Sequence, residues 1–419
     1  MGIVLNNLHP FLSPQRSVGR LALATACALA GAPAWALTDF HPYATVATEY
    51  ESNVFDRSAG QPPYADTGNT KLGDTVFKYL GGADLDIAWE RDRLRLNAQG
   101  ERFEYDRFGQ LDHTEYKFGG DFDWHLGPVL DGSLVYNQNH IMSPPADTLS
   151  DVLELQTERT ATSTFRVLVT PRWRFDLAPT WHELETPLQE YPDFGLKEGG
   201  AAASLNYLGI NKLTAGLRIE YTDGAFHDII AATSYHQTTA QLTADYAVSG
   251  FSAFDGRIGY TERTNSLVDA GQAIAQGVDI AGIEGKTNSF TGELGFRRQL
   301  SVKTSVYLSI FRRVESYVAG ANTDIGTGGD VGATWNPDVK FTVSLHYRQE
   351  TQSIQGVQFI TGFANRVDHL HSAELFVKYH IRDWLTLRPY VSHDDRGSNY
   401  PDISYLATIV GIDLTARWQ

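Results

Sequence analysis

Residues 93–99, RLRLNAQ, alternate strictly between polar and apolar side chains. Successive side chains of a β-strand point to opposite faces, so Leu94 and Leu96 share one face while Arg93 and Arg95 share the other. In a transmembrane barrel the apolar face meets lipid and the polar face meets the lumen. A slip of one residue would move each arginine into lipid, at a cost of about 2 to 4 kcal/mol near the midplane. The stretch therefore predicts a membrane-spanning strand with a well-determined register.

The same alternation recurs along most of the chain, in segments long enough to cross a bilayer as tilted strands. The clearest segments are 85–89, 93–102, 115–124, 130–138, 163–169, 213–221, 241–248, 302–313, 340–348, 385–390 and 406–418. The pattern directs Leu217, Leu308 and Leu345 toward lipid. With weaker segments in the gaps, we expect an all-β, antiparallel, up-and-down transmembrane barrel of about 18 strands, and 16 strands are also compatible.

Short and long connections alternate, as in barrels whose two ends face different compartments. Short turns are expected at 90–92, 126–128, 170–171, 209–211, 249–250, 336–338 and 382–383, on the periplasmic side. Long, extracellular connections are expected at 52–73, 141–155, 186–197, 225–233, 265–284, 352–365 and 394–401. An even strand number returns both termini to the periplasm, and Trp418 supplies the aromatic ending that exported barrels commonly carry.

The first 36 residues resemble a cleavable export signal. Arg16 and Arg20 precede an Ala-rich apolar run over 21–32, and 34–36, AWA, offers small residues where a signal peptidase reads them. The run is too short to be a transmembrane helix, which needs about 20 residues. We therefore predict cleavage after Ala36 and a mature chain, 37–419, that forms one barrel domain in the outer membrane of a Gram-negative bacterium.

Composition is consistent with this assignment. The only cysteine, Cys27, lies in the signal, so the mature chain can form no disulfide or thiolate metal site. Lipidation at Cys27 is disfavoured because Ala24 replaces the usual bulky residue of a lipoprotein signal. The net charge of −16 gives no basic footprint for nucleic acid.

Collecting the inward positions predicts a lumen lined by both signs of charge. The candidate lumen residues are Arg93, Arg95, Arg166, Arg174, Arg218, Arg297, Lys303, Arg313, Arg348, Arg388, Asp84, Asp86, Asp121, Glu220 and Glu293. One interpretation is a wall of ion pairs that neutralise one another. The other is a translocation path whose arginines bind carboxylates or sugar hydroxyls transiently.

The start of the mature chain carries a motif, residues 40–43, FHPY, followed by 50–57, YESNVFDR. With Tyr50, Asn53 and Phe55 at its key positions, it resembles the opening of the EpsL-type β-barrel porins associated with exopolysaccharide biosynthesis, although Glu51 stands where the family's pattern has an aspartate. The resemblance implies an outer-membrane barrel that passes a nascent polysaccharide, with periplasmic and inner-membrane synthesis proteins as partners.

The residues of the motif also have a direct physical interpretation. Asn53 and Asp56 favour a turn where the first strand leaves the membrane. Tyr43, Tyr50 and Phe55 are expected at interfacial depth. The oxygen atoms here lack the full ligand set of a recognised calcium loop.

Enzymatic functions receive little support from the sequence. His369 and His371 share a strand face, and His393 precedes two aspartates, but interfacial histidines with ordinary solvation explain them. A metal site would need a third ligand beside the first two. No phosphate-binding glycine loop or nucleophile elbow occurs. We expect no enzyme activity, no cofactor and no metal.

These observations predict a passive exopolysaccharide channel in contact with outer-membrane lipid. Two alternatives remain. One is a general porin for small solutes such as oligosaccharides or organic acids, and the other is a structural or adhesive barrel with a closed lumen.

Overall fold

The computed structural model describes residues 37–58, 61, 71–145, 153–186, 195–209, 212–227, 233–267, 285–317, 322–357, 364–400 and 403–418. Strands make up most of this part of the chain. They are β1 (Leu37–Glu51), β2 (Asp74–Trp89), β3 (Asp92–Tyr105), β4 (His113–Leu126), β5 (Leu130–Met142), β6 (Leu155–Thr170), β7 (Trp173–Glu185), β8 (Gly195–Leu208), β9 (Leu213–His227), β10 (Thr233–Ser249), β11 (Ser252–Leu267), β12 (Gly285–Ser301), β13 (Thr304–Tyr317), β14 (Asn322–Asp338), β15 (Phe341–Val357), β16 (Ala364–Arg382), β17 (Leu385–Ser398) and β18 (Tyr405–Arg417).

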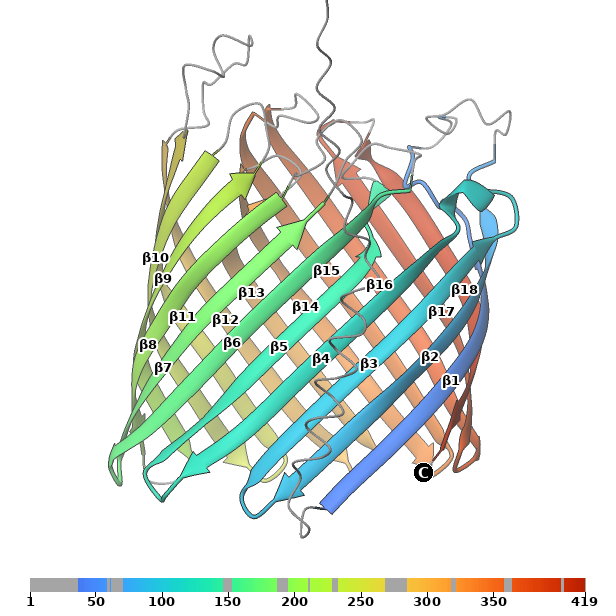
Figure 1. The fold of residues 1–419 in the computed structure, drawn as a ribbon. Coiled ribbons are helices and arrows are strands. Elements are labelled where there is room, and N and C mark those ends of the chain that lie inside the picture. Colours follow the sequence, from blue (N-terminus) through green and yellow to red (C-terminus); the bar gives the residue numbers. More distant parts are fainter. Residues whose placement is uncertain are drawn as a thin grey trace, which may run out of the picture.

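The 18 strands form one closed antiparallel sheet (Figure 1). Each strand pairs with its neighbours in sequence, and β1 pairs with β18 from Tyr43 opposite Arg417 to Glu51 opposite Ile409. A closed sheet leaves no unpaired edge, which is the condition for a β-structure in lipid. The prediction of an 18-stranded up-and-down barrel is confirmed, and the 16-strand alternative is wrong.

The two ends of the barrel differ in their connections. At the turn end, the lower end in Figure 1, neighbouring strands are joined by two to four residues, and the C-terminal strand ends there too. The predicted short turns lie at this end, apart from residues 210–211, which are outside the described residues. The turn predicted at 336–338 is displaced, because these residues end β14 and Val339 and Lys340 form the turn. One turn was missed: Val302 and Lys303 separate β12 from β13, so the segment predicted from 302 begins as a strand at Thr304. The backbone N–H of Lys303 donates to the Ser301 hydroxyl at 3.2 Å, a local bond that favours a turn.

At the loop end, opposite the turn end, several strands run further than the alternation predicts. β17 continues to Ser398, and β15 continues to Val357, so the long connections predicted at 394–401 and 352–365 begin later. The reason is that the outward face is no longer apolar above the lipid. Outward positions on β17 are taken by His393 and Asp395, so the sequence pattern fades while the backbone pairing continues.

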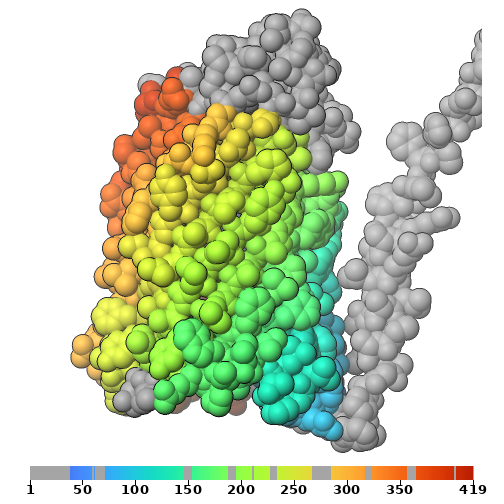
Figure 2. Space-filling model, turned by 90° about the vertical axis from the view of Figure 1, so that its left-hand side faces the viewer, coloured from blue at the N-terminus to red at the C-terminus, as the bar shows by residue number. Residues whose placement is uncertain are grey.

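The outer face of the barrel is apolar, with aromatic residues at two levels. Figure 2 shows it as a continuous wall of side chains over the strands in view. Leu217, Leu308 and Leu345 are exposed on it, as predicted. Exposed aromatic residues gather near the turns (Trp173, Phe251, Trp335, Trp384 and Trp418) and again about eight residues further along the strands (Trp181, Tyr221 and Tyr260). Two such levels are the pattern expected of the aromatic girdles of a membrane-spanning barrel.

The predicted signal peptide, its cleavage after Ala36 and Cys27 lie outside the described residues, as do parts of the long connections. Among the described residues, no helix has both the length and the apolar character needed to cross a membrane.

Candidate functional site

Contacts across the interior identify the inward face of the wall. Ser316 on β13 donates a hydrogen bond of 2.8 Å to Glu198 on β8. Five strand spacings separate these strands, about 24 Å along the wall at roughly 4.8 Å each, so the two side chains can meet only inside the barrel. From Glu198, the cross-strand register carries the inward face through β9, β10, β11 and β12 to Phe311 and, by alternation, to Glu315 on β13. Ser316 has the opposite parity on β13 and reaches Glu198 from the end of the strand, beyond the last pair of β12 with β13, Gly292 opposite Arg312. Exposed Leu242 and Leu294 then lie on the outward face.

All the predicted lumen arginines lie on strands, on the inward face, and each of them has a carboxylate partner. The pairs are Arg93 with Asp86, Arg95 with Asp121, Arg166 with Asp131, Arg174 with Asp176, Arg218 with Glu220, Arg297 with Asp255, Arg313 with Glu315, Arg348 with Glu350 and Arg388 with Asp413. Asp84 pairs with Arg417, and Glu293 pairs with Arg257. The sequence had placed both signs of charge on one face, and the structure brings them into direct contact.

Lys303 is the exception among the predicted lumen residues. It lies in the turn between β12 and β13, where its ammonium group donates to the carbonyl of Pro337. The predicted strand was begun too early, at 302, because the turn residues Val302 and Lys303 continue the alternating pattern of polar and apolar side chains. Lys303 therefore belongs to the rim at the turn end and not to the strand wall.

Of the ion pairs named above, all but those of Arg313 and Arg348 lie in the half of the barrel nearer the turns, and we call this set the turn-end belt. It comprises the pairs of Arg93, Arg95, Arg166, Arg174, Arg218, Arg257, Arg297, Arg388 and Arg417 with the partners named above. Most of its charges are solvated: the Arg297 side chain is 71% exposed and that of Arg93 is 51% exposed, whereas that of Asp413 is only 10% exposed. Exposed pairs of this kind contribute only about 0 to 1 kcal/mol each, so their side chains can exchange partners easily.

Aromatic rings lie beside this belt. The Arg417 guanidinium lies 5.0 Å from the centre of the Tyr43 ring, and that of Arg388 lies 5.1 Å from Tyr390. The Tyr43 hydroxyl donates to Gln99 at 3.2 Å. The expectation that Tyr43 lies at interfacial depth is wrong, because its pairing with Arg417 places it on the inward face.

The loop end is packed differently from the belt. Leu196, Phe226 and Tyr235 form a buried cluster on the inward faces of β8, β9 and β10. The Tyr235 hydroxyl donates to Glu198, and the Arg263 guanidinium lies 3.5 Å from the centre of the Tyr235 ring. Together with the bond from Ser316 to Glu198, these contacts join β8 to β13 across the sector of the interior that lies between these two strands. We call this set the corner cluster.

A second buried group lies further along the loop end. Arg366 on β16 is fully buried and donates from Nε to both oxygens of Asp368, at 2.8 and 3.0 Å. Arg396 on β17 donates to the same carboxylate at 2.9 Å. Sequence analysis missed these residues and also Arg263 because the strands were ended too early. Continuing the alternation from Arg257 along β11 would have placed Arg263 on the inward face.

The motif at 50–57 builds a third packed region at the loop end. Asn53 accepts from the Arg57 N–H at 3.0 Å and donates to the carbonyls of Arg57, at 2.8 Å, and Leu406, at 3.2 Å. The turn predicted at Asn53 and Asp56 is present, and Asp56 has a φ of 49°. Asn53 thus ties the first hairpin to the last strand.

The aromatic residues of this motif differ in their exposure to solvent. Tyr50 is exposed on the outward face, as expected. Phe55 is only 1% exposed and packs edge-on against Phe108, at 4.8 Å between ring centres, so its expected interfacial position is wrong. The physical reason is that the chain beyond β1 folds over its neighbours and buries Val54 and Phe55 together.

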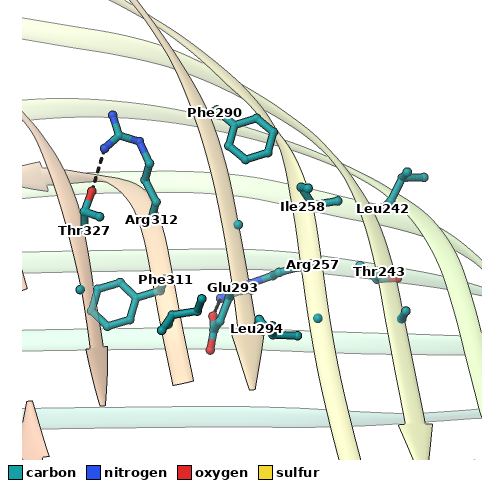
Figure 3. A pocket seen from close by; sticks show the side chains of 15 residues that line it. Leu242, Thr243, Arg257, Ile258, Phe290, Glu293, Leu294, Phe311, Arg312 and Thr327 are labelled. Carbon is teal, nitrogen blue, oxygen red and sulfur yellow. Dashed lines mark hydrogen bonds and ion pairs between the residues drawn. The ribbon is translucent and has the colours of Figure 1, made fainter. Parts of the chain in front are cut away.

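The outward face also has a recess, lined by Leu242, Ile258, Phe290 and Leu294 (Figure 3). Arg312 lies at its edge and donates to Thr327 at 2.7 Å. Arg312 stands eight residues after the start of β13, level with the aromatic girdle nearer the loops, where a charge costs only about 0 to 1 kcal/mol. Because the recess faces lipid, it is not part of the lumen.

Three histidines that could have supported chemistry also lie on the outward face. His371 is 3.0 Å from the Tyr347 hydroxyl, and His369 is 3.0 Å from the Thr351 hydroxyl. His393 is 2.8 Å from the Thr408 hydroxyl. Each has an ordinary hydroxyl partner on a neighbouring strand.

No family model and no curated protein matches the chain, so the resemblance of the motif to exopolysaccharide-associated barrels has no family match behind it. Among solved structures, the outer membrane protein OpdK from Pseudomonas aeruginosa is similar at 12% identity over 91% of this chain and 99% of its own, with a TM-score of 0.45. OccAB3 from Acinetobacter baumannii is similar at 11% identity over 91% and 100%, with a TM-score of 0.44. The FrpB iron transporter from Neisseria meningitidis is similar at 10% identity over 85% and 62%, with a TM-score of 0.46. These values are too low to transfer a cargo to this chain.

Proposed function

We propose that this outer-membrane barrel is a passive channel that exports an exopolysaccharide without covalent chemistry on its cargo. The observation that carries the proposal is the turn-end belt, a set of mostly solvated arginine–carboxylate pairs on strands between β2 and β12 and on β17 and β18, with aromatic rings beside them. Its guanidinium groups donate hydrogen bonds and its carboxylates accept them, so both can engage sugar hydroxyls. Because the exposed ion pairs of the belt are weak, a polymer can displace and release their side chains in turn as it moves.

The identity of the cargo as a polymer rests on the motif at 50–57 and its resemblance to exopolysaccharide-associated barrels. In this proposal, inner-membrane synthesis proteins and periplasmic partners deliver the chain at the turn end, which faces the periplasm in barrels of this kind. The polymer then leaves at the loop end.

A second candidate is a porin for small solutes. The specific observation in its favour is the packed loop end, where the corner cluster and the buried group around Asp368 occupy part of the interior. A small oligosaccharide or organic acid needs less room at this point than a polymer does.

The experiment that tests the proposal compares surface polymer with periplasmic polymer in a strain that lacks the protein. Export predicts that polymer is lost from the surface and accumulates in the periplasm, and that the wild-type gene restores secretion. Unchanged surface polymer would overturn the proposal. Liposome swelling with purified protein then tests the porin: rapid entry of small sugars, unaffected by added polysaccharide, would favour the second candidate.

A further inference from the structure

We propose that Glu315, Asp324 and Glu350 form a divalent-cation site on the inward face near the loop end. The site is independent of the cargo, so it holds for either candidate function. Glu315 lies on β13, Asp324 on β14 and Glu350 on β15, and one carboxylate oxygen from each residue lies within 4.8 Å of the other two. Glu315 and Asp324 are opposite one another in the cross-strand register.

Two of these carboxylates are buried with oxygens that have no hydrogen-bond partner among the described residues. Asp324 is 3% exposed, and its Oδ1 receives no hydrogen bond. Glu350 is 2% exposed, and its Oε1 receives none. A Cβ at Gly326 would clash with this same oxygen, so the glycine keeps the space around it open. Burying an ionised carboxylate without a partner is costly, which points to a ligand in this space.

The neighbouring arginines do not supply a partner for these two carboxylate oxygens. Arg313 binds Glu315 through Nε at 2.8 Å and approaches Oε2 of Glu350 at 3.8 Å. Arg348 donates to the same Oε2. Glu350 therefore directs Oε2 to the arginines and leaves Oε1 without a hydrogen bond, while no ion pair with a described residue reaches Asp324.

The two other arginines of this region, Arg366 and Arg396, bind Asp368. Both arginines are therefore paired with a carboxylate that lies outside the proposed site. The cluster thus has three closely spaced acidic groups and two arginines in direct contact with it.

The chemistry of the ligand set favours Ca²⁺. The three side chains offer only oxygen, which is the donor that hard cations prefer. Oxygens that bind one Ca²⁺ at about 2.3 to 2.6 Å can lie up to about 5 Å from one another, which matches the observed spacing. Mg²⁺ demands a near-ideal octahedron and dehydrates reluctantly, so a cluster of three carboxylates, two of them buried, suits it less well. The Glu315 side chain is 43% exposed, which gives an ion a route in and room for water ligands.

The test is calorimetric titration of Ca²⁺ into the purified, folded full-length barrel after treatment with EDTA. We expect one site with a Kd of about 10⁻⁴ to 10⁻³ M, as in extracellular calcium modules. Asp324→Asn keeps the shape of the side chain, removes its charge and should weaken binding by at least about tenfold. Asp245→Asn is the matched control, because it removes an inward carboxylate on β10 that lies away from the cluster, and it should bind as the wild type does.

Two results would overturn the proposal: absence of binding by the wild-type barrel up to about 10 mM Ca²⁺, or equal affinity in the wild type and Asp324→Asn. If Asp324→Asn does not fold, Glu315→Gln takes its place, since that side chain is partly exposed. Ca²⁺ should also raise the unfolding temperature of the wild type and not that of the variant, because a ligand stabilises only the state it binds. None of these readouts uses transport, so they do not depend on the proposed function.

Discussion

Replacing Glu198 by Gln should loosen the corner cluster and change conduction. Glu198 accepts from the Tyr235 hydroxyl, from Ser316 at 2.8 Å, and its other oxygen lies 2.8 Å from Nδ1 of His182. Gln keeps nearly the same shape but has no charge and only one acceptor oxygen. The variant therefore weakens the contact between β8 and β13 without leaving a large cavity.

The magnitude follows from these three contacts. A hydrogen bond to a charged group contributes about 1.5 to 3 kcal/mol and a neutral one about 0.5 to 1.5, so each contact loses about 1 kcal/mol. Allowing for non-additivity, the corner loses about 2 to 3 kcal/mol. At about 1.4 kcal/mol per factor of ten, the fraction of molecules in which the contact between β8 and β13 is broken should rise roughly 30- to 150-fold.

The assay is single-channel recording of the purified barrel in a planar bilayer, with urea unfolding of the same samples. Glu198→Gln should visit a high-conductance state far more often than the wild type does. Glu158→Gln is the matched control: Glu158 also binds His182, at 3.2 Å, but its partners among the described residues lie only on the strands next to β6. The reasoning is refuted if Glu198→Gln and the wild type give the same conductance histograms, or if Glu158→Gln gives the same increase.

Three further changes test other parts of the barrel. Arg95→Gln leaves Asp121 and Asp123 without the arginine that pairs with both, so the reversal potential in a salt gradient should shift toward cation selectivity, with stability changed by less than about 1 kcal/mol; an unchanged potential would place Arg95 outside the conducting path. Asn53→Ala removes the side-chain bonds that tie the first hairpin to the last strand and should lower the free energy of unfolding in urea by about 1 to 3 kcal/mol; a smaller loss would mean that the turn holds without its side chain. Leu308→Arg places a charge midway between the two aromatic girdles and should cost about 2 to 4 kcal/mol in a lipid-refolding titration, an effect that no inward substitution on the same strand should reproduce.

Membrane register could be predicted because it is encoded locally. On a strand such as β3, polar and apolar residues alternate with a period of two, and a shift by one residue would place Arg93 and Arg95 in lipid. The short turns carry their own signals, such as the glycine at 127 with its φ of 70°. Where a turn keeps the alternating pattern, as at Val302 and Lys303, the same reasoning places a residue wrongly.

Contacts at the loop end could not be predicted in this way. Outside the lipid the outward face need not be apolar, so alternation no longer marks where a strand ends, and Arg263, Arg366 and Asp324 escaped notice. Phe55 was assigned to the membrane interface because an aromatic residue near a strand end usually lies there. It is buried instead because the chain past β1 turns back over the barrel rim.

By itself, the sequence determined the strands, the direction of their two faces and the order of turns and loops, because each of these depends on neighbours a few residues apart. The tertiary structure alone decided which charges meet. Asn53 bonds to Leu406, and Glu198 bonds to Ser316, across separations of 353 and 118 residues. These contacts depend on how the closed sheet curves and which strands it brings face to face, and a pattern with a period of two contains no information about that curvature.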